Sequence, residues 1–328
     1  GLEDPVGAIT EEYTRPNGLL IQRRRIPLGV IGVIYESRPN VTVEAASLCF
    51  FAGNGLLLRG GSEAFHSNHI LAKILKSALA EYGLEEVINM APTTDRSSVD
   101  EMAKMNDVLD VIIPRGGEGL IRHIYEIATV PVIAHYKGNC HMFIDETAKV
   151  DSAVSIAMNS KTQRPGVCNA LETLLVHEKV AAQFLPAFLT EAHKQQVEIR
   201  GCEKTQAFSE KVIPVTHEDF DTEFLDLILA VRVVADLPAA IDHIQTYTSD
   251  HTEVIVSEDR ENIETFTRAL DSSAIIVNAS TRFNDGGQLG LGAEIGISTT
   301  KLHSFGPMGL RELTTTKFVV TGSGQLRN

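Results

Sequence analysis

One segment of the chain places a cysteine close to two cationic side chains. Residues 159–169 read Asn-Ser-Lys-Thr-Gln-Arg-Pro-Gly-Val-Cys-Asn, so Cys168 follows a Pro-Gly break and comes after Lys161 and Arg164. A cysteine attacks an electrophile as the thiolate, and nearby positive charge or backbone N–H groups lower its pKa. Cys168 is therefore a candidate nucleophile. Lys161 and Arg164 are candidates for stabilising the thiolate or holding an anionic leaving group.

The alternative for Cys168 is a structural role, because cysteine generally behaves as a small apolar core residue. The other cysteines, Cys49, Cys140 and Cys202, are scattered and form no CxxC pair. This spacing indicates neither a disulfide framework nor a zinc knuckle, and it implies a reducing, cytosolic compartment. The eleven histidines show no ligand spacing either, since the adjacent Cys140 and His141 would face opposite sides of a strand. We therefore expect structural histidines and no metal.

The length and charge of the chain limit its architecture and its partners. A chain of 328 residues is long enough for two domains. Its net charge of −14 argues against binding to nucleic acid or to an anionic membrane surface. No apolar run approaches the roughly 18–20 residues that span a bilayer. The chain begins at Gly1 without an initiator methionine, and we expect that a further segment precedes it in the full-length protein.

Short apolar segments rich in β-branched residues alternate with amphipathic segments along the chain. This alternation predicts an α/β fold in which helices cover both faces of parallel sheets. We expect strands at 31–35, 56–58, 87–90, 111–113, 130–134, 173–176, 227–234, 254–257 and 274–278, and helices at 41–52, 64–79, 178–194, 238–247 and 259–270. Residues 197–224 read as connecting structure. The β-rich ends, 19–26 and 314–321, are expected to pair with each other or across a subunit interface.

Two glycine-rich turns each join a predicted strand to a predicted helix. The first reads Arg59-Gly60-Gly61-Ser62, and the second reads Pro114-Arg115-Gly116-Gly117. Backbone N–H groups at such a turn, together with the positive end of the following helix, suit a phosphate group. Each turn also carries an arginine, so the two turns together point to a nucleotide. Ordinary turns with solvated arginines are the alternative.

A third polar loop, residues 278–287, follows the last predicted strand and contains Arg282. Ligands in open α/β sheets bind at the carboxyl ends of strands. We therefore expect Arg282 to clamp a carboxylate or a phosphate with two hydrogen bonds. An exposed arginine in a simple turn is the alternative.

Several blocks of the sequence resemble those of the gamma-glutamyl phosphate reductases, also called glutamate-5-semialdehyde dehydrogenases, a family of the aldehyde dehydrogenase superfamily. The resemblance covers essentially the whole chain. Its blocks are residues 26–42, 58–61, 113–117, 161–173, 278–287, 290–294 and 306–310. Members of the family carry an N-terminal helical segment ahead of Asp4-Pro5. The resemblance assigns that segment to the cofactor domain, and we expect the sequence given to begin after it.

The resemblance implies an aldehyde dehydrogenase-like fold with three parts. Residues 28–136 would form a Rossmann-like NADPH-binding domain without its N-terminal part, and residues 137–305 would form an α/β catalytic domain. The β segments 7–27 and 309–328 would form an oligomerisation flap, so the resemblance also implies a homo-oligomer.

The activity implied by the resemblance is a cytoplasmic step of proline biosynthesis. L-Glutamyl 5-phosphate would be reduced by NADPH to L-glutamate 5-semialdehyde, with release of phosphate, and glutamate 5-kinase is a possible partner. Cys168 falls on the family's nucleophile and would carry a thioacyl intermediate. The backbone N–H of Cys168 and the side chain of Asn40 would stabilise the oxyanion. Substrate contacts would come from Lys161, Arg164, Asn169 and Arg282.

Two departures from related dehydrogenases bear on the chemistry. Hydrolytic relatives hold a glutamate base at the place of His135, and an enzyme that exchanges phosphate with its thioester, as the resemblance implies, needs no activated water. NAD-preferring relatives keep a ribose-binding glutamate at about the place of Ser62, so Ser62 and Arg59 together would admit the 2′-phosphate of NADPH. A hydrolytic aldehyde dehydrogenase and an inactive truncated scaffold remain the alternatives.

Overall fold

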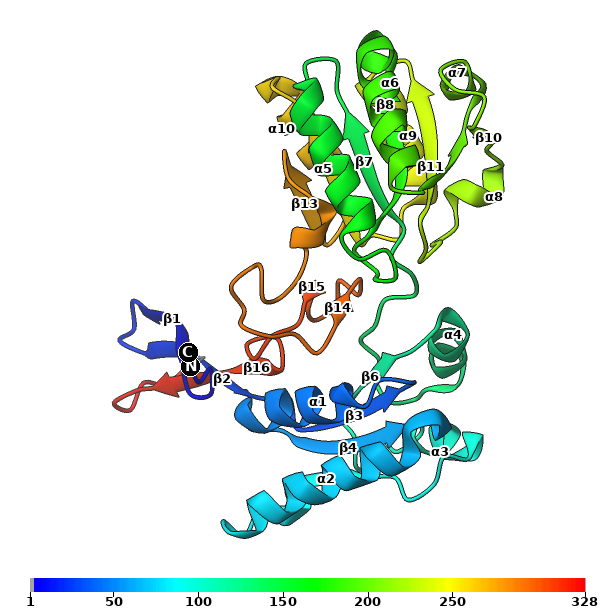
Figure 1. Cartoon of the computed structure of the whole chain (residues 1–328). Helices are drawn as coiled ribbons and strands as arrows, with labels where there is room; N and C mark the ends of the chain where they lie inside the picture. The colour runs from blue at the N-terminus through cyan, green and yellow to red at the C-terminus, as the bar shows by residue number, and fades with distance from the viewer. Residues whose placement is uncertain (1–2, 328) are drawn as a thin grey trace. The chain divides into compact units, whose positions relative to one another are not determined.

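The computed structural model describes residues 3–327, which form two compact units (Figure 1). One unit contains residues 3–134 together with 290–327, and the other contains residues 135–289. Each unit is built on a parallel sheet, which confirms the predicted α/β class. Within residues 3–327, no helix combines the length and the apolar character needed to cross a membrane.

The first unit contains a four-stranded parallel sheet in the order β5-β4-β3-β6. Its strands are β3 (Val30–Tyr35), β4 (Gly55–Gly60), β5 (Ile88–Met90) and β6 (Val111–Arg115), and its helices are α1 (Asn40–Phe51), α2 (Phe65–Ala80), α3 (Arg96–Met102) and α4 (Glu118–Ile127). Tyr35 lies opposite both Gly60 and Arg115, so three strands end together at one edge. The chain reverses its direction of travel across the sheet at β3, which makes the carboxyl end of β3 a topological switch point.

Apolar side chains on alternate positions of β3 build the two faces of this sheet. Val33 packs with the α1 residue Ala45 in one core cluster, whereas Ile34 packs with Val99 of α3 and Ile124 of α4 in another. Because neighbouring strand residues point to opposite faces, this division confirms that helices cover both sides.

The strand predicted at 130–134 does not form. Val132 makes only an isolated parallel bridge to Ile112. The backbone oxygen of Pro131 accepts a hydrogen bond from Ile112, but a proline has no N–H group with which to continue a ladder.

Both ends of the chain pair with each other in a three-stranded antiparallel sheet, which confirms one of the two pairings expected for them. Its order is β1-β2-β16, with β1 at Ile9–Thr14, β2 at Leu20–Pro27 and β16 at Thr314–Thr321. Phe318 and Val320 on β16 are exposed. A role of this sheet in oligomerisation stays a prediction.

Residues 290–305 were expected to belong to the catalytic domain, but they belong to the first unit. In this region β14 (Ile297–Ser298) pairs with β15 (Gly306–Pro307). The buried side chains of Ile295 and Met308 pack in the same core cluster as β3 and β4. This apolar contact explains why the second unit ends at Leu289.

The second unit contains a seven-stranded parallel sheet in the order β10-β9-β11-β8-β7-β12-β13. Its strands are β7 (Cys140–Ile144), β8 (Leu171–His177), β9 (Glu198–Gly201), β10 (Ile213–Pro214), β11 (Ile228–Val234), β12 (Thr252–Val256) and β13 (Ala274–Val277). Its helices are α5 (Val150–Thr162), α6 (Glu178–Lys194), α7 (Glu203–Gln206), α8 (His217–Phe220), α9 (Leu237–Tyr247) and α10 (Arg260–Ala269). One core cluster includes α5 and α6, and another includes α9 and α10.

The region 197–224 was expected to be connecting structure, but it holds β9, α7, β10 and α8. These elements are only two to four residues long. Elements this short carry too little hydrophobic periodicity for the sequence to reveal them.

Candidate active site

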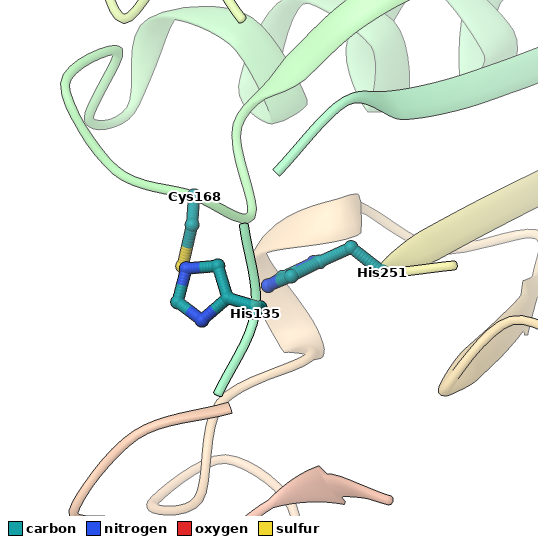
Figure 2. A group of neighbouring side chains, drawn as sticks. All are labelled: His135, Cys168 and His251. Carbon is teal, nitrogen blue, oxygen red and sulfur yellow. The ribbon is translucent and has the colours of Figure 1, made fainter. Parts of the chain in front are cut away.

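Three side chains from distant parts of the chain meet in the second unit, as Figure 2 shows. One ligand atom each from His135, Cys168 and His251 lies within 4.8 Å of the other two. These residues precede β7, β8 and β12, whose amino ends are aligned by the register of the sheet. The sequence did not predict a cluster at these amino ends, and the expected binding role of the loop after the last strand of the sheet stays a prediction.

A tight turn presents the thiol of Cys168. The backbone N–H of Ala170 donates to the carbonyl of Val167 at 3.0 Å, which closes the turn around Cys168 and Asn169. The thiol of Cys140 donates to the Cys168 carbonyl at 3.2 Å. Burial raises the pKa of Cys140 well above its usual value. Cys140 therefore stays a neutral donor, whereas Cys168 is the partly exposed thiol.

The backbone at Gly138 lies directly against this turn. A Cβ atom at Gly138 would stand 2.0 Å from the carbonyl oxygen of Cys168 and 2.6 Å from its Cα. Contacts this short are with backbone atoms, which cannot swing aside as a flexible side chain can. The position of Cys168 therefore depends on residue 138 being a glycine, which has no Cβ atom.

Lys161 was expected to contact the substrate, but the structure buries it in an ion pair. Its Nζ lies 2.6 Å from the Glu172 carboxylate, and the two side chains are 1% and 0% exposed. Burial lowers the pKa of Lys161 and raises that of Glu172 to about 7, although the attraction between them opposes both shifts. Lys161 lies in the last turn of α5 and Glu172 is the second residue of β8, so the pair joins the two ends of the loop that carries Cys168.

Asn169 was also expected to contact the substrate, but its side chain is buried and stabilises the loop that carries Cys168. Its Nδ2 donates to the carbonyl of Asn284 at 2.9 Å. The Asn284 side chain in turn donates to Thr252 Oγ1 at 2.8 Å, at the amino end of β12. Asn169 therefore connects the Cys168 turn to the segment that carries Arg282.

The buried histidine of the cluster has one free nitrogen. His251 is 0% exposed, and burial holds its pKa well below the usual value, so its imidazole is neutral. Its Nδ1 lies 2.8 Å from Thr252 Oγ1, whereas its Nε2 has no hydrogen-bond partner among residues 3–327. Figure 2 shows the His251 ring directed toward His135. His135 and His251 therefore lie beside the candidate nucleophile, whereas the sequence predicted only structural histidines; a role for them in the chemistry is a proposal.

Arg282 lies in electrostatic reach of Cys168, and Arg164 lies in electrostatic reach of Arg282. Arg282 donates from Nε to Gln163 at 2.8 Å, and burial lowers the pKa of Arg282. The negative charges of Asp285 and Cys168 oppose that shift, and the positive charge of Arg164 adds to it. Within residues 3–327 neither arginine has a carboxylate within salt-bridge distance. Both remain candidates for binding an anionic substrate.

In the first unit, Arg59 does not project freely toward a phosphate as predicted. It is 7% exposed and directs its guanidinium to the start of α3. There it donates to Ser98 Oγ at 3.2 Å and to the carbonyls of Thr94 and Asp95 at 2.6 and 3.2 Å. Arg59 therefore holds the loop before α3.

Gly60, which follows Arg59, ends β4, and a Cβ atom at this position would stand 2.2 Å from Asn68 Nδ2. Ser62 is exposed and begins a short 3-10 helix after Gly61.

The second glycine-rich turn joins β6 to α4. The N–H of Gly117 donates to a carboxylate oxygen of Glu36 at 2.9 Å, so this helix terminus already has an anionic partner. A Cβ at Gly117 would meet no protein atom within 4 Å except that carboxylate oxygen, which leaves open space above the turn. Pro114 is buried in β6. A Cβ atom at Gly296 would stand 2.8 Å from a guanidinium nitrogen of Arg115, so this arginine lies close to Gly296.

These features fit a dinucleotide at the switch point beside β3. The backbone provides the features that suit a dinucleotide. Helices α1 and α4 both begin at the carboxyl edge of the sheet, and small residues occupy the turns before the helices. A phosphate at Gly117 would have to displace the side chain of Glu36. The predicted cofactor contacts Gly60, Gly61, Ser62 and Gly116 stay predictions.

Asn40, the predicted oxyanion donor, is the first residue of α1. It is exposed, and its Nδ2 donates to Glu44 Oε1 at 2.8 Å. Its role in stabilising an oxyanion also stays a prediction.

Known proteins are similar to this chain over nearly its whole length. A model of the aldehyde dehydrogenase family matches residues 6–208. A gamma-glutamyl phosphate reductase of Desulforapulum autotrophicum is 57% identical over 327 residues, which are 99% of this chain and 78% of that protein. The crystal structure of gamma-glutamyl phosphate reductase from Thermotoga maritima has a TM-score of 0.98 at 51% identity, covering 100% of this chain and 80% of that one.

A more distant structure shares the fold. An acetylating aldehyde dehydrogenase from Geobacillus thermoglucosidasius matches with a TM-score of 0.73 at 20% identity, over 94% of this chain and 78% of that chain.

The close approach at Gly138 yields a prediction. Replacing Gly138 by Ala should push the Cys168 backbone out of place and lower the rate of Cys168 alkylation and any Cys168-dependent turnover by at least about tenfold. Gly166→Ala is the matched control, because its Cβ would meet only the Leu225 carbonyl oxygen at 3.6 Å. Iodoacetamide labelling followed by peptide mass spectrometry measures both variants. Equal loss of reactivity in the two, or in neither, would contradict the assignment.

Proposed function

Because the chain belongs to the aldehyde dehydrogenase family, and within it to the gamma-glutamyl phosphate reductases, we propose that it reduces L-glutamyl 5-phosphate to L-glutamate 5-semialdehyde and releases phosphate. The chain is an oxidoreductase of this family and uses a nicotinamide cofactor, for which we propose NADPH. The observation that supports the proposal most directly is the partly exposed Cys168 thiol, with two imidazoles beside it and the Arg282 guanidinium within electrostatic reach.

The first half of the proposed reaction takes place at the sulfur of Cys168. The thiolate attacks the acyl carbon, a C–S bond forms, and the bond from that carbon to the phosphate oxygen breaks. Nitrogen atoms of His135 and His251 lie within 4.8 Å of the sulfur, so an imidazole there can accept the thiol proton. Arg164 and Arg282 bind the departing phosphate and the substrate carboxylate.

The second half reduces the thioester. NADPH, when bound, supplies a hydride, and the thioester carbon accepts it to give a hemithioacetal. Collapse of that intermediate breaks the C–S bond, releases the aldehyde and returns the thiolate. Each half passes through an oxyanion, which we assign to the backbone N–H of Cys168 and to the side chain of Asn40.

His135 stands where hydrolytic relatives keep a glutamate base. A reductase that exchanges phosphate with its thioester needs no activated water, so it has no use for a glutamate base at this place. The thioester is then reduced, or attacked by phosphate in the reverse direction. This distinguishes the proposed reductase from a hydrolytic aldehyde dehydrogenase.

We also propose where the reaction belongs in the cell. The four free cysteines suit a reducing cytoplasm. The substrate is an acyl phosphate, so a kinase that phosphorylates the side-chain carboxylate of glutamate must supply it, and glutamate 5-kinase is the proposed partner for that step of proline biosynthesis. The exposed β16 side of the three-stranded sheet suits assembly of a homo-oligomer.

The dependence on phosphate tests the reaction type. In the reverse direction, oxidation of glutamate 5-semialdehyde with NADP+ should require phosphate or arsenate, because the thioacyl enzyme is released by an oxyanion and not by water. Cys168→Ala should abolish this turnover, whereas Cys202→Ala should leave it unchanged. Oxidation at full rate without either anion would identify a hydrolytic dehydrogenase. Absence of any turnover in the wild-type chain would identify an inactive scaffold.

The role of the two arginines can be measured separately. Arg282→Ala and Arg164→Ala should each lower kcat/KM for L-glutamyl 5-phosphate by about ten- to a hundredfold, since each removes a charge-assisted hydrogen bond worth roughly 1.5–3 kcal/mol. Arg260→Ala is the control, because Arg260 is a surface residue whose side chain is 92% exposed. An unchanged kcat/KM in Arg282→Ala would make Arg282 a turn residue.

The cofactor preference rests on Ser62. The wild-type chain should use NADPH with a kcat/KM at least about tenfold above that for NADH, because no carboxylate at residue 62 repels the 2′-phosphate. Ser62→Glu should lower the value for NADPH and reduce or reverse the preference, while Ser62→Ala serves as the size control. Equal efficiency of the wild-type chain with both cofactors would contradict this assignment.

A further inference from the structure

The His135, Cys168 and His251 side chains supply a donor set that the proposed reaction does not require. A thiolate and two imidazoles are the ligands that Zn²⁺ prefers in proteins. The reaction needs the sulfur as a nucleophile and needs at most one imidazole as a proton acceptor. A second, buried imidazole is left without a function in that chemistry.

His251 provides the strongest indication of a ligand. Its Nδ1 lies 2.8 Å from Thr252 Oγ1, and that oxygen also accepts a hydrogen bond from Asn284. The pKa of His251 is held well below its usual value by burial, so Nε2 carries a lone pair when Nδ1 carries the proton. Nε2 is buried and has no hydrogen-bond partner among the described residues. A buried lone pair without a partner is costly unless something occupies the space that it faces.

The dimensions of the cluster suit a tetrahedral ion with little rearrangement. Zn²⁺ lies about 2.0–2.3 Å from nitrogen and sulfur ligands, which places two ligands of one ion about 3.5 Å apart. The three candidate atoms here lie within 4.8 Å of one another. His135 and Cys168 are partly buried and His251 is buried, and a shift of about 1 Å among the three side chains would bring them to that spacing.

We propose that His135, Cys168 and His251 bind a thiophilic divalent cation, Zn²⁺ above all, and that this binding reversibly inhibits the enzyme. The Cys168 thiol gives up its proton to solvent as its sulfur forms the bond to the metal. The sulfur lone pair that would attack the acyl phosphate is then donated to the metal, so Cys168 cannot act as a nucleophile. The fourth position on the metal stays open to water or an anion, as in a site with three protein ligands.

Electrostatics single out the sulfur as the essential ligand. The positive charges of Arg164 and Arg282 work against a bound cation, and Cys168 is the one ligand that contributes a negative charge. The proposal therefore predicts that loss of the sulfur removes binding, whereas loss of one imidazole weakens it. This inference concerns the free protein and does not require the proposed substrate to be correct.

The test uses the full chain with Co²⁺ or Zn²⁺ alone, without substrate or dinucleotide. Wild-type protein titrated with Co²⁺ should develop a thiolate-to-cobalt charge-transfer band together with the visible bands of a tetrahedral ion, and Zn²⁺ should displace them at one ion per chain. Cys168→Ala should lose the charge-transfer band. His135→Ala, at a partly exposed loop position, should raise the dissociation constant for Zn²⁺ at least about tenfold.

Cys202→Ala is the control, since Cys202 is a second partly exposed thiol in the same unit. It should bind like the wild-type chain. Near-UV circular dichroism verifies that each variant is folded. The proposal is overturned if the wild-type chain shows no thiolate charge-transfer band, or if folded Cys168→Ala and His135→Ala bind Zn²⁺ as tightly as the wild-type chain. Either result can occur while the reductase activity itself is confirmed, so the two proposals fail independently.

Discussion

The buried ion pair between Lys161 and Glu172 is the constraint on which the active-site loop depends. It joins the last turn of α5 to the start of β8, and the residues between them carry Cys168. Removing one partner of such a pair leaves an uncompensated buried charge, at a cost of about 3–5 kcal/mol. The Cys140 thiol and the Gly138 backbone then fix the cysteine within the loop. The thiol is thus held by buried structure while its sulfur remains partly exposed.

Much of the fold follows from hydrophobic patterning. The strands from β3 to β6 and the helices α1 and α6 were predicted from local sequence within a few residues, because each has several turns or alternations of apolar character. The failures share a physical cause. Residues 130–134 have a strand-like composition, but Pro131 ends the ladder. Residues 290–305 have no regular pattern, and their place in the first unit is decided by long-range packing of residues such as Ile295. Neither effect is visible in a local window.

The candidate site was predicted only in part, for a similar reason. Cys168 stood out because a thiol, a Pro-Gly break and two cations are close in sequence. Nothing in spacing connects it to His251, and the two meet only because parallel strands align their amino ends. The only sequence signal was that His251 lies three residues before the strand predicted at 254–257. The positive charges of Lys161 and Arg59 suggested contacts to a ligand. In the structure the Lys161 ammonium group pairs with a buried carboxylate, and the Arg59 guanidinium donates to backbone carbonyls, so both groups stabilise the protein's own loops.

The central claim is that the sulfur of Cys168 becomes acylated before any reduction occurs. Mass spectrometry of the chain mixed with L-glutamyl 5-phosphate, with NADPH withheld, tests it most directly. The account predicts a glutamyl thioester on the peptide that contains Cys168, removable by hydroxylamine and absent from Cys140. An unmodified Cys168 in a preparation that turns over normally once NADPH is added would contradict it.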